Sequence, residues 1–200
     1  QPGCFCDSWG INPAVAEGAD VVMFDLGDRY GLEAKTDSGA EVLDAVKGFL
    51  SEGEAALPKV SCTLKVEVPP GLPEKLKKMF DHPLWGEICR RCLNCGLCTY
   101  ICPTCHCFDI QSYNVGDRGF KYRCWDSCMF SEYTLMAGGH NPRPTKKERV
   151  RNRFLHKLQY YPERYGEFGC VGCGRCLVKC PVGMDITRLI ARIREVDVDG

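Results

Sequence analysis

The sequence contains the same cysteine pattern twice, as Cys92-Leu-Asn-Cys95-Gly-Leu-Cys98-Thr-Tyr-Ile-Cys102-Pro103 and as Cys170-Val-Gly-Cys173-Gly-Arg-Cys176-Leu-Val-Lys-Cys180-Pro181. In each run, two residues separate successive members of a cysteine triplet, and a fourth cysteine, followed by proline, comes after three more residues. This is the run that holds 4Fe-4S clusters in bacterial ferredoxins. Gly96, Gly172 and Gly174 keep the intervening backbone small enough to wrap tightly around a cluster. The pattern therefore predicts two 4Fe-4S clusters.

The ligands of the two clusters are expected to cross between the runs, because the fourth cysteine of each run serves the other cluster in two-cluster ferredoxins. One predicted ligand set is Cys92, Cys95, Cys98 and Cys180. The other is Cys170, Cys173, Cys176 and Cys102. Zinc sites usually use two separated cysteine pairs, and disulfide frameworks are typical of small secreted chains. Neither pattern fits these runs.

The composition restricts the class of protein. The chain has 200 residues, 16 of them cysteine, and 44% of its residues are hydrophobic. Lys and Arg together number 26, as do Asp and Glu, so net charge gives no argument for nucleic-acid or membrane binding. No apolar run approaches the ~20 residues needed to cross a bilayer. Thiols kept free for cluster ligation predict a reducing, cytoplasmic setting.

Residues 1–80 are predicted to form an α+β lobe. We expect a helical turn at 14–17, a hairpin of strands 19–26 and 30–36, a helix over 39–52, a strand over 60–68 and a short helix over 74–81. Ser38 and Glu41 have the spacing of a capping box for the longer helix. The lobe has no nucleotide-binding glycine fingerprint. Since the sequence begins at Gln1 rather than Met, we expect this lobe to be truncated at its N-terminus.

Residues 81–200 are predicted to form a ferredoxin-like module with a long helical insertion at 108–166 between the two runs. Cys124 and Cys128 would share one helical face, and residues 131–137 would continue as helix. A capping box at Thr145 and Glu148 predicts a helix that ends near residue 160, before Pro162. A closing amphipathic helix is expected over 184–196.

The helix after Thr145 has an apolar and a basic side on the helical count. Its predicted inward residues are Val150, Phe154, Leu158 and Tyr161, and its predicted outward residues are Arg149, Arg151, Arg153 and Lys157. Two interpretations of the basic side remain open. It is either a solvated face or a docking surface for an acidic partner subunit.

The other cysteines suggest a third metal site. Cys62 is interpreted as a small buried residue of its strand, and Cys89 as a packed thiol. The close pairs among the rest predict a third iron-sulfur cluster whose ligands come from Cys4, Cys6, Cys105, Cys107 and Cys128. The alternatives are packed thiols, or a site completed by upstream sequence.

Several motifs outside the two runs add a family resemblance. They are Cys4-Phe-Cys6, Gly18-Ala-Asp20, Leu26-Gly-Asp28, Cys102-Pro-Thr-Cys105-His-Cys107, Trp125-Asp-Ser-Cys128 and Gly138-Gly139. With the second run, they resemble the iron-sulfur beta subunits of cytoplasmic sulfhydrogenase-type NiFe hydrogenases and the A subunit of anaerobic sulfite reductase. The resemblance implies an electron-relay subunit beside a flavin-bearing subunit that exchanges electrons with NAD(P)H. The catalytic partner would be a NiFe hydrogenase subunit or a sirohaem sulfite reductase subunit.

The leading hypothesis is a non-catalytic electron-transfer subunit of a multi-subunit oxidoreductase. One alternative is a chain with its own thiol or cluster-based catalytic site, as in heterodisulfide chemistry, although the adjacent Cys-Cys signature expected of such a site is missing. A free ferredoxin is the other alternative. The insertion, the N-terminal lobe and the basic helix argue against it, because they suggest fixed partners.

Overall fold

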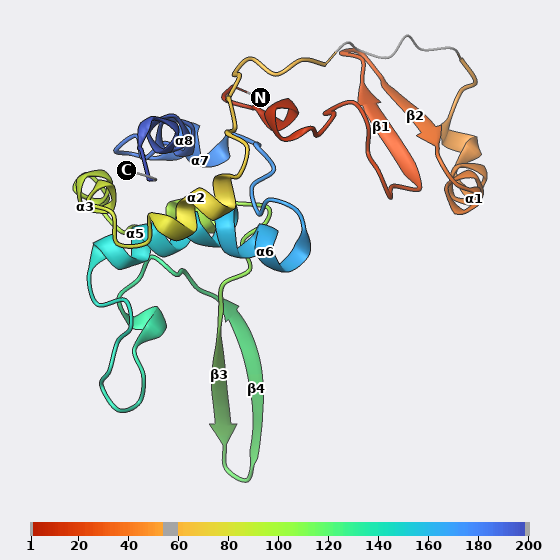
Figure 1. Ribbon diagram of the computed structural model, residues 1–200. Helices are drawn as coiled ribbons and strands as arrows, with labels where there is room; N and C mark the ends of the chain where they lie inside the picture. The colour runs from red at the N-terminus through yellow and green to blue at the C-terminus, as the bar shows by residue number, and fades with distance from the viewer. Residues whose placement is uncertain (1, 54–59, 199–200) are drawn as a thin grey trace. The chain divides into compact units, whose positions relative to one another are not determined.

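The computed structural model describes residues 2–53 and 60–198, which divide into two compact units (Figure 1). The first unit comprises Gln1–Ile11 and Cys62–Gly200, and the second comprises Asn12–Ser61. The division therefore differs from the predicted domain boundary at residue 80. Residues 62–80 belong with the cysteine runs because Leu72, Leu76 and Met79 are buried in the core of the first unit.

The second unit contains the predicted hairpin. Strands β1 (Val21–Asp25) and β2 (Tyr30–Ala34) pair antiparallel, from Val21 opposite Ala34 to Asp25 opposite Tyr30. Helix α1 (Asp37–Ala45) follows, and a 3-10 turn covers Lys47–Phe49. The predicted capping box is wrong. The helix begins earlier because the Thr36 side chain accepts a hydrogen bond from the Gly39 N–H at 3.2 Å.

Two short elements near the ends of the lobe differ from prediction. Residues 14–17 form turns rather than helix, and a 3-10 helix covers Cys6–Trp9 instead. Residues 62–68 alternate in burial as predicted, but they join no sheet in the part of the chain that the structure describes. Their backbone bonds to the N-terminal segment, with the Leu64 N–H donating to the Cys4 carbonyl and the Val66 N–H to Ser8 Oγ.

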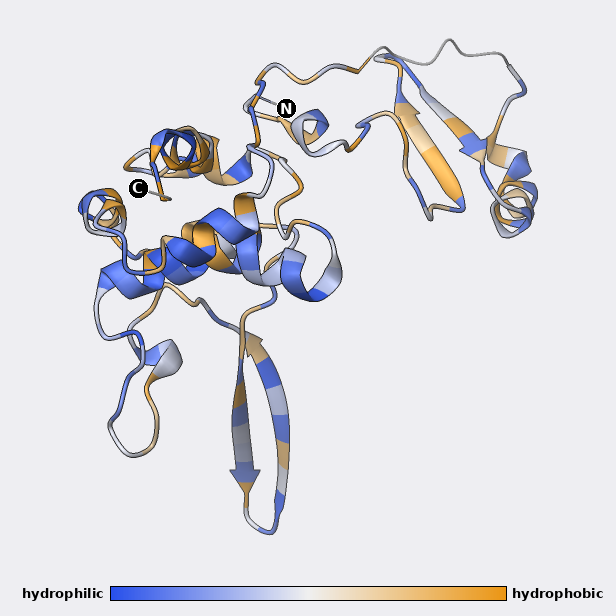
Figure 2. Ribbon diagram, in the orientation of Figure 1, coloured by the Kyte–Doolittle hydropathy of each residue, from blue (hydrophilic) through white to orange (hydrophobic). Residues whose placement is uncertain are grey.

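Helices build the core of the first unit (Figures 1 and 2). They are α2 (Leu72–Lys78), α3 (Leu84–Cys89), α5 (Lys146–Leu155) and α8 (Ile186–Glu195). Trp85 is fully buried among them and donates its indole N–H to the Met79 carbonyl at 2.7 Å. The predicted closing helix is confirmed as α8, whose buried residues are Ile186, Leu189, Ile190 and Ile193. Burying this apolar stripe drives the helix onto the core.

The insertion begins as a β-hairpin, so the prediction of a wholly helical insertion is wrong. Strands β3 (Phe108–Val115) and β4 (Arg118–Trp125) pair antiparallel, and all of β3 is exposed. Cys124 therefore lies on a strand and Cys128 beyond it, not on one helical face. Only Glu132–Thr134 forms a 3-10 turn within the helix predicted over 131–137. The missed signal is Gly116-Asp117, a two-residue turn with Gly116 at φ 58°.

The capping box at Thr145 and Glu148 is confirmed at the start of α5. The helical path does not stop before Pro162, however. It continues through a π-helical segment (His156–Tyr160) into α6 (Tyr161–Tyr165), where Pro162 occupies the first turn. Pro162 has no N–H to donate to the preceding turn, and the wider π-helical turn lies directly before it. No helix among residues 2–53 and 60–198 is long and apolar enough to span a membrane.

Candidate iron-sulfur centres

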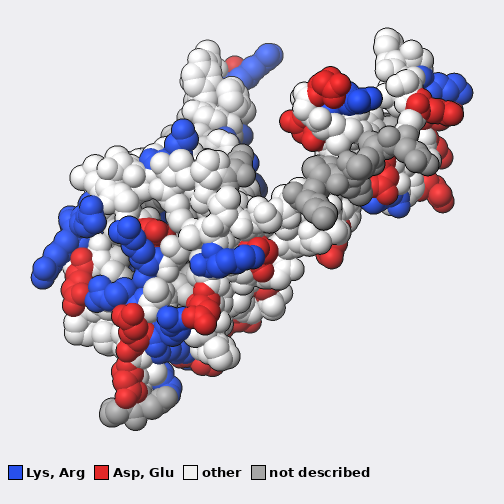
Figure 3. All heavy atoms as spheres, turned by 90° about the horizontal axis from the view of Figure 1, so that it is seen from above, with Lys and Arg blue, Asp and Glu red and all other residues white. Residues whose placement is uncertain are grey.

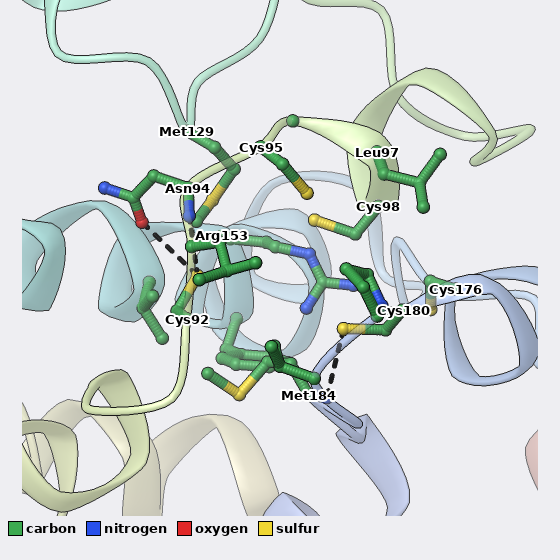
Figure 4. Close-up of a pocket in the computed structure, with 16 residues that line it drawn as sticks. Cys92, Asn94, Cys95, Leu97, Cys98, Met129, Arg153, Cys176, Cys180 and Met184 are labelled. Atoms are coloured by element: carbon green, nitrogen blue, oxygen red, sulfur yellow. Dashed lines mark hydrogen bonds between the residues drawn. The ribbon is translucent and has the colours of Figure 1, made fainter.

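One pocket gathers the first predicted ligand set (Figure 4). Its lining includes Cys92, Cys95 and Cys98 from the first run and both Cys176 and Cys180 from the second. Helix α4 (Leu97–Tyr100) carries Cys98, and α7 (Arg175–Lys179) ends one residue before Cys180. Contact between α4 and α7 brings the runs together. Cys180 lies with the first triplet, as the crossed prediction requires, but Cys176 of the second set lines the same pocket, so the division of ligands between the clusters stays a prediction.

The second predicted set lies at the other ends of the same two helices. Burial raises the pKa of Cys170 to about 11, and the nearby thiols of Cys176 and Cys102 contribute. Burial also raises the pKa of Cys176, and the nearby thiols of Cys102 and Cys173 contribute to that increase. The first run therefore supplies Cys102 to the neighbourhood of the second run, as Cys180 of the second run joins the first.

Hydrogen-bond donors point at several of these sulfurs. The Asn94 N–H donates to Cys92 Sγ at 3.4 Å, and the Met184 N–H donates to Cys180 Sγ at 3.1 Å. Asn94 has a left-handed backbone at φ 54°, which lets the loop turn its N–H back toward Cys92. Such bonds stabilise negative charge on sulfur and are one of the means by which a protein sets a cluster's reduction potential.

The prediction that the basic side of α5 faces outward is wrong for most of its residues. Arg149, Arg153 and Lys157 are all less than 9% exposed. Arg149 donates to the carbonyls of Arg143 and Pro144 at 3.0 and 3.1 Å, which ties down the loop before the helix. Arg151 is half-buried, with its guanidinium carbon 3.7 Å from the Phe80 ring centroid. On the face shown in Figure 3, Lys and Arg stand among Asp and Glu.

Arg153 extends into the pocket that holds the first cysteine set (Figure 4). The residue is 3% exposed, and its Nε and Nη1 atoms have no hydrogen-bond partner among the described residues. Burial alone would lower the pKa of Arg153, but the Cys98 and Cys176 thiolates outweigh it and raise that pKa. A buried guanidinium with unpaired N–H groups requires an anion beside it. Thiolate-bound clusters carry net negative charge, so this pocket fits one.

Lys157 serves the second set from the π-helical segment, four positions after Arg153. Its Nζ donates to Cys102 Sγ at 3.3 Å, to Thr104 Oγ1 at 3.0 Å and to the Gly169 carbonyl at 2.9 Å. The Lys157 carbonyl in turn accepts from the Gly169 N–H at 2.9 Å. This one residue therefore both anchors the start of the second run and places a positive charge on a ligand of the second set.

The cysteines predicted for a third cluster fall into separate groups. Cys4 and Cys6 contact Cys62, which was interpreted as strand core. Hydrogen bonds from neighbouring thiols lower the pKa of two of the others: Cys128 acts on Cys107, and Cys105 acts on Cys102. Cys89 is 7% exposed and bonds to the Gly86 carbonyl, as expected of a packed thiol. Cys62 was missed because an alternating strand pattern already accounts for a buried residue at that position.

Comparison with known proteins identifies the kind of domain that the two runs belong to. Residues 91–184 match the model of the 4Fe-4S dicluster domain. The chain is 31% identical over 205 aligned residues to sulfhydrogenase 2 subunit beta of Pyrococcus furiosus, covering 96% of this chain and 60% of that protein. No solved structure matches the chain.

The domain match supports two 4Fe-4S clusters, as the cysteine runs predict. The resemblance to sulfhydrogenase beta subunits is confirmed over nearly the whole chain, and residues 91–184 form a 4Fe-4S dicluster domain.

Proposed function

We propose that this chain is the electron-transfer iron-sulfur subunit of a hydrogenase-type oxidoreductase complex. The observation that carries the proposal is that the two cysteine runs come together around buried Arg153 and Lys157. The ligand sets are Cys92, Cys95, Cys98 and Cys180 for one cluster and Cys170, Cys173, Cys176 and Cys102 for the other. Each 4Fe-4S cluster supplies a one-electron carrier.

The residues around these carriers hold them, shield them from water and adjust their reduction potentials. Met129, Phe154 and Met184 line the first pocket and limit access of water. The N–H groups of Asn94 and Met184 and the charges of Arg153 and Lys157 stabilise the more negative, reduced form of each centre. A positive charge near a centre favours its reduction, so the two cations make both centres better electron acceptors.

The proposed partners are those that the family resemblance of the motifs implies. The Pyrococcus protein is named as a sulfhydrogenase subunit, and this chain spans 60% of its length. We propose a flavin-bearing, NAD(P)H-linked subunit on one side and a catalytic subunit of the NiFe or sirohaem type on the other, in the cytoplasm. Exposed apolar side chains on the β3–β4 hairpin, including Ile110, Phe120 and Trp125, favour a chain built for assembly over a free ferredoxin.

The ligand crossing is tested by iron analysis of anaerobically purified protein. The unaltered chain should bind about 8 irons, and Cys180→Ser should lose about 4 of them although it alters the second run. The matched control is Cys89→Ser, which should retain all of them. If Cys180→Ser instead abolished the electron paramagnetic resonance signal of the cluster held by Cys170, Cys173 and Cys176, the crossed assignment would be wrong.

The relay function is tested with the purified complex from native extract. We expect the chain to co-purify with a flavoprotein, and its centres to be reduced by NAD(P)H only when that flavoprotein is present. A chain that elutes alone in anaerobic gel filtration would support the free-ferredoxin alternative. Substrate turnover by the isolated chain would support the catalytic one.

A further inference from the structure

Three thiols outside the two cluster runs lie in mutual contact. Cys4 Sγ is 3.6 Å from Cys6 Sγ, Cys6 Sγ is 3.4 Å from Cys62 Sγ, and Cys62 Sγ is 3.7 Å from Cys4 Sγ. Cys6 is buried, and Cys4 and Cys62 are half-buried. These three thiols form a triangle that is nearly equilateral. Cys62 lies 56 positions after Cys6 in the sequence, so the fold, and not sequence proximity, brings this third thiol to the other two.

The size of the triangle identifies the kind of metal site. A tetrahedral ion with metal-sulfur bonds of about 2.3 Å holds its ligands about 3.8 Å apart, close to the separations found here. The ligands of a cubane each bind a different iron and are held farther apart. We propose that Cys4, Cys6 and Cys62 bind one thiophilic divalent cation of the zinc type, as a mononuclear site separate from the two clusters.

The fold builds this triangle against the second cysteine run. The Phe5 N–H donates to the Gly172 carbonyl at 2.8 Å. A Cβ on Gly172 would lie 2.7 Å from the Cys6 Cα, and one on Gly174 would lie 2.2 Å from the Gly3 carbonyl oxygen. The glycines of the second run are therefore required by the N-terminal segment as well as by the cluster loop. The backbone that presents Cys4 and Cys6 is fixed by these contacts.

The third ligand is presented from the opposite side of the N-terminal segment. The Leu64 N–H donates to the Cys4 carbonyl at 3.3 Å, and the Val66 N–H donates to Ser8 Oγ at 3.0 Å. Lys65 forms an ion pair with Asp7 between the same two segments. These bonds flank Cys62 and hold its thiol toward Cys4 and Cys6. All three sulfurs are thus positioned by backbone that is bonded independently of any metal.

The position of the site in the chain suggests its role. Cys4 and Cys6 precede residues 12–61, and Cys62 follows them directly, while all three cysteines belong to the first unit. A bound cation would therefore link the segment by which the chain leaves the first unit to the segment by which it returns. It would also brace the loop at Gly172 and Gly174, next to ligands of the second cluster. The site is structural in this proposal, and no electron passes through it.

The test uses the full chain, produced anaerobically in zinc-supplemented medium and dialysed against a weak chelator. We expect about one zinc per chain in addition to the cluster iron, and X-ray absorption at the zinc edge should give a sulfur-dominated shell at about 2.3 Å. Cys62→Ser should lower zinc affinity at least tenfold while iron content stays unchanged. Cys124→Ser, on exposed β4, is the matched control and should keep its zinc.

Three results would overturn the proposal. The first is unchanged zinc affinity in Cys62→Ser. The second is a loss of iron rather than zinc when Cys4 or Cys6 is replaced by Ser, which would indicate a third cluster. The third is a disulfide among these cysteines in anaerobic protein. If Cys62→Ser fails to fold, Co²⁺ loading of the unaltered chain decides: sulfur-to-cobalt absorption must appear and must be displaced by zinc.

Discussion

The β3–β4 hairpin and helix α5 both lie between the two cysteine runs, yet they differ completely in burial. Every residue of β3 is exposed, whereas α5 buries Arg149, Val150, Arg153, Phe154 and Leu155. Both segments are rich in basic and apolar residues. The difference is that α5 packs Val150, Phe154 and Leu155 into the core and directs Arg153 toward the cysteine thiols, whereas the hairpin packs against no such groups among the residues that the structure describes. Apolar packing and the thiols opposite Arg153 together account for the orientation of this helix.

The largest effect that separates the two segments should come from their aromatic residues. Phe154 is 0% exposed, so Phe154→Ala should lower the free energy of unfolding by about 3–5 kcal/mol. Phe120→Ala in the hairpin, at 59% exposure, should change it by less than about 0.5 kcal/mol. Anaerobic urea denaturation of the cluster-loaded chain measures both. Equal losses would mean that the hairpin is as much a part of the folded core as α5.

Lys157 should give the next largest effect. Lys157→Met leaves the Gly169 carbonyl without its lysine donor and removes the charge beside Cys102, at a cost of about 1–3 kcal/mol. We expect slower iron incorporation at the second centre, followed by visible absorption during anaerobic reconstitution. Lys121→Met, on exposed β4, is the control and should reconstitute at the unaltered rate. Identical rates in the two variants would show that Lys157 does not contribute to assembly of the second centre.

Arg153 tests the electrostatic part of the comparison. Arg153→Met should lower the reduction equilibrium constant of the first centre about tenfold, or about 59 mV for one electron, because the buried countercharge is lost. Arg153→Lys should restore most of the shift, and Arg123→Met in the hairpin should cause none. Redox titration monitored by electron paramagnetic resonance distinguishes these variants. A Lys variant as shifted as the Met variant would point to packing rather than charge.

Arg151 should have the smallest effect. Its guanidinium lies 3.7 Å from the Phe80 ring centroid and bonds to the Phe80 carbonyl at 3.0 Å. Arg151→Ala should therefore lower the free energy of unfolding by about 0.5–1 kcal/mol and leave both reduction potentials unchanged. The same denaturation and redox titrations apply. A shift in either potential would show that the outer edge of α5 also acts on the centres.

The sequence predicted the features whose signal is local. The cysteine runs, the capping box at Thr145 and the apolar stripe of α8 each depend on neighbours a few residues away, and the structure contains all three. The direction of Arg153 and Lys157 was mispredicted because helical spacing gives the angle of a side chain but not what lies opposite it. Cys62 was missed for a related reason, since its partners Cys4 and Cys6 are remote in sequence.

The π-helical segment at His156–Tyr160 has a consequence for how this region can change. A π turn contains one more residue than an α turn, and each residue advances a helix by about 100°. Deleting one residue from this segment would turn everything after it, including Gly169 and the second run, by that angle relative to Arg153. The extra residue therefore sets the angle between Arg153, which faces the first run, and the segment that leads to the second run. We expect substitutions within this segment to be tolerated more readily than insertions or deletions.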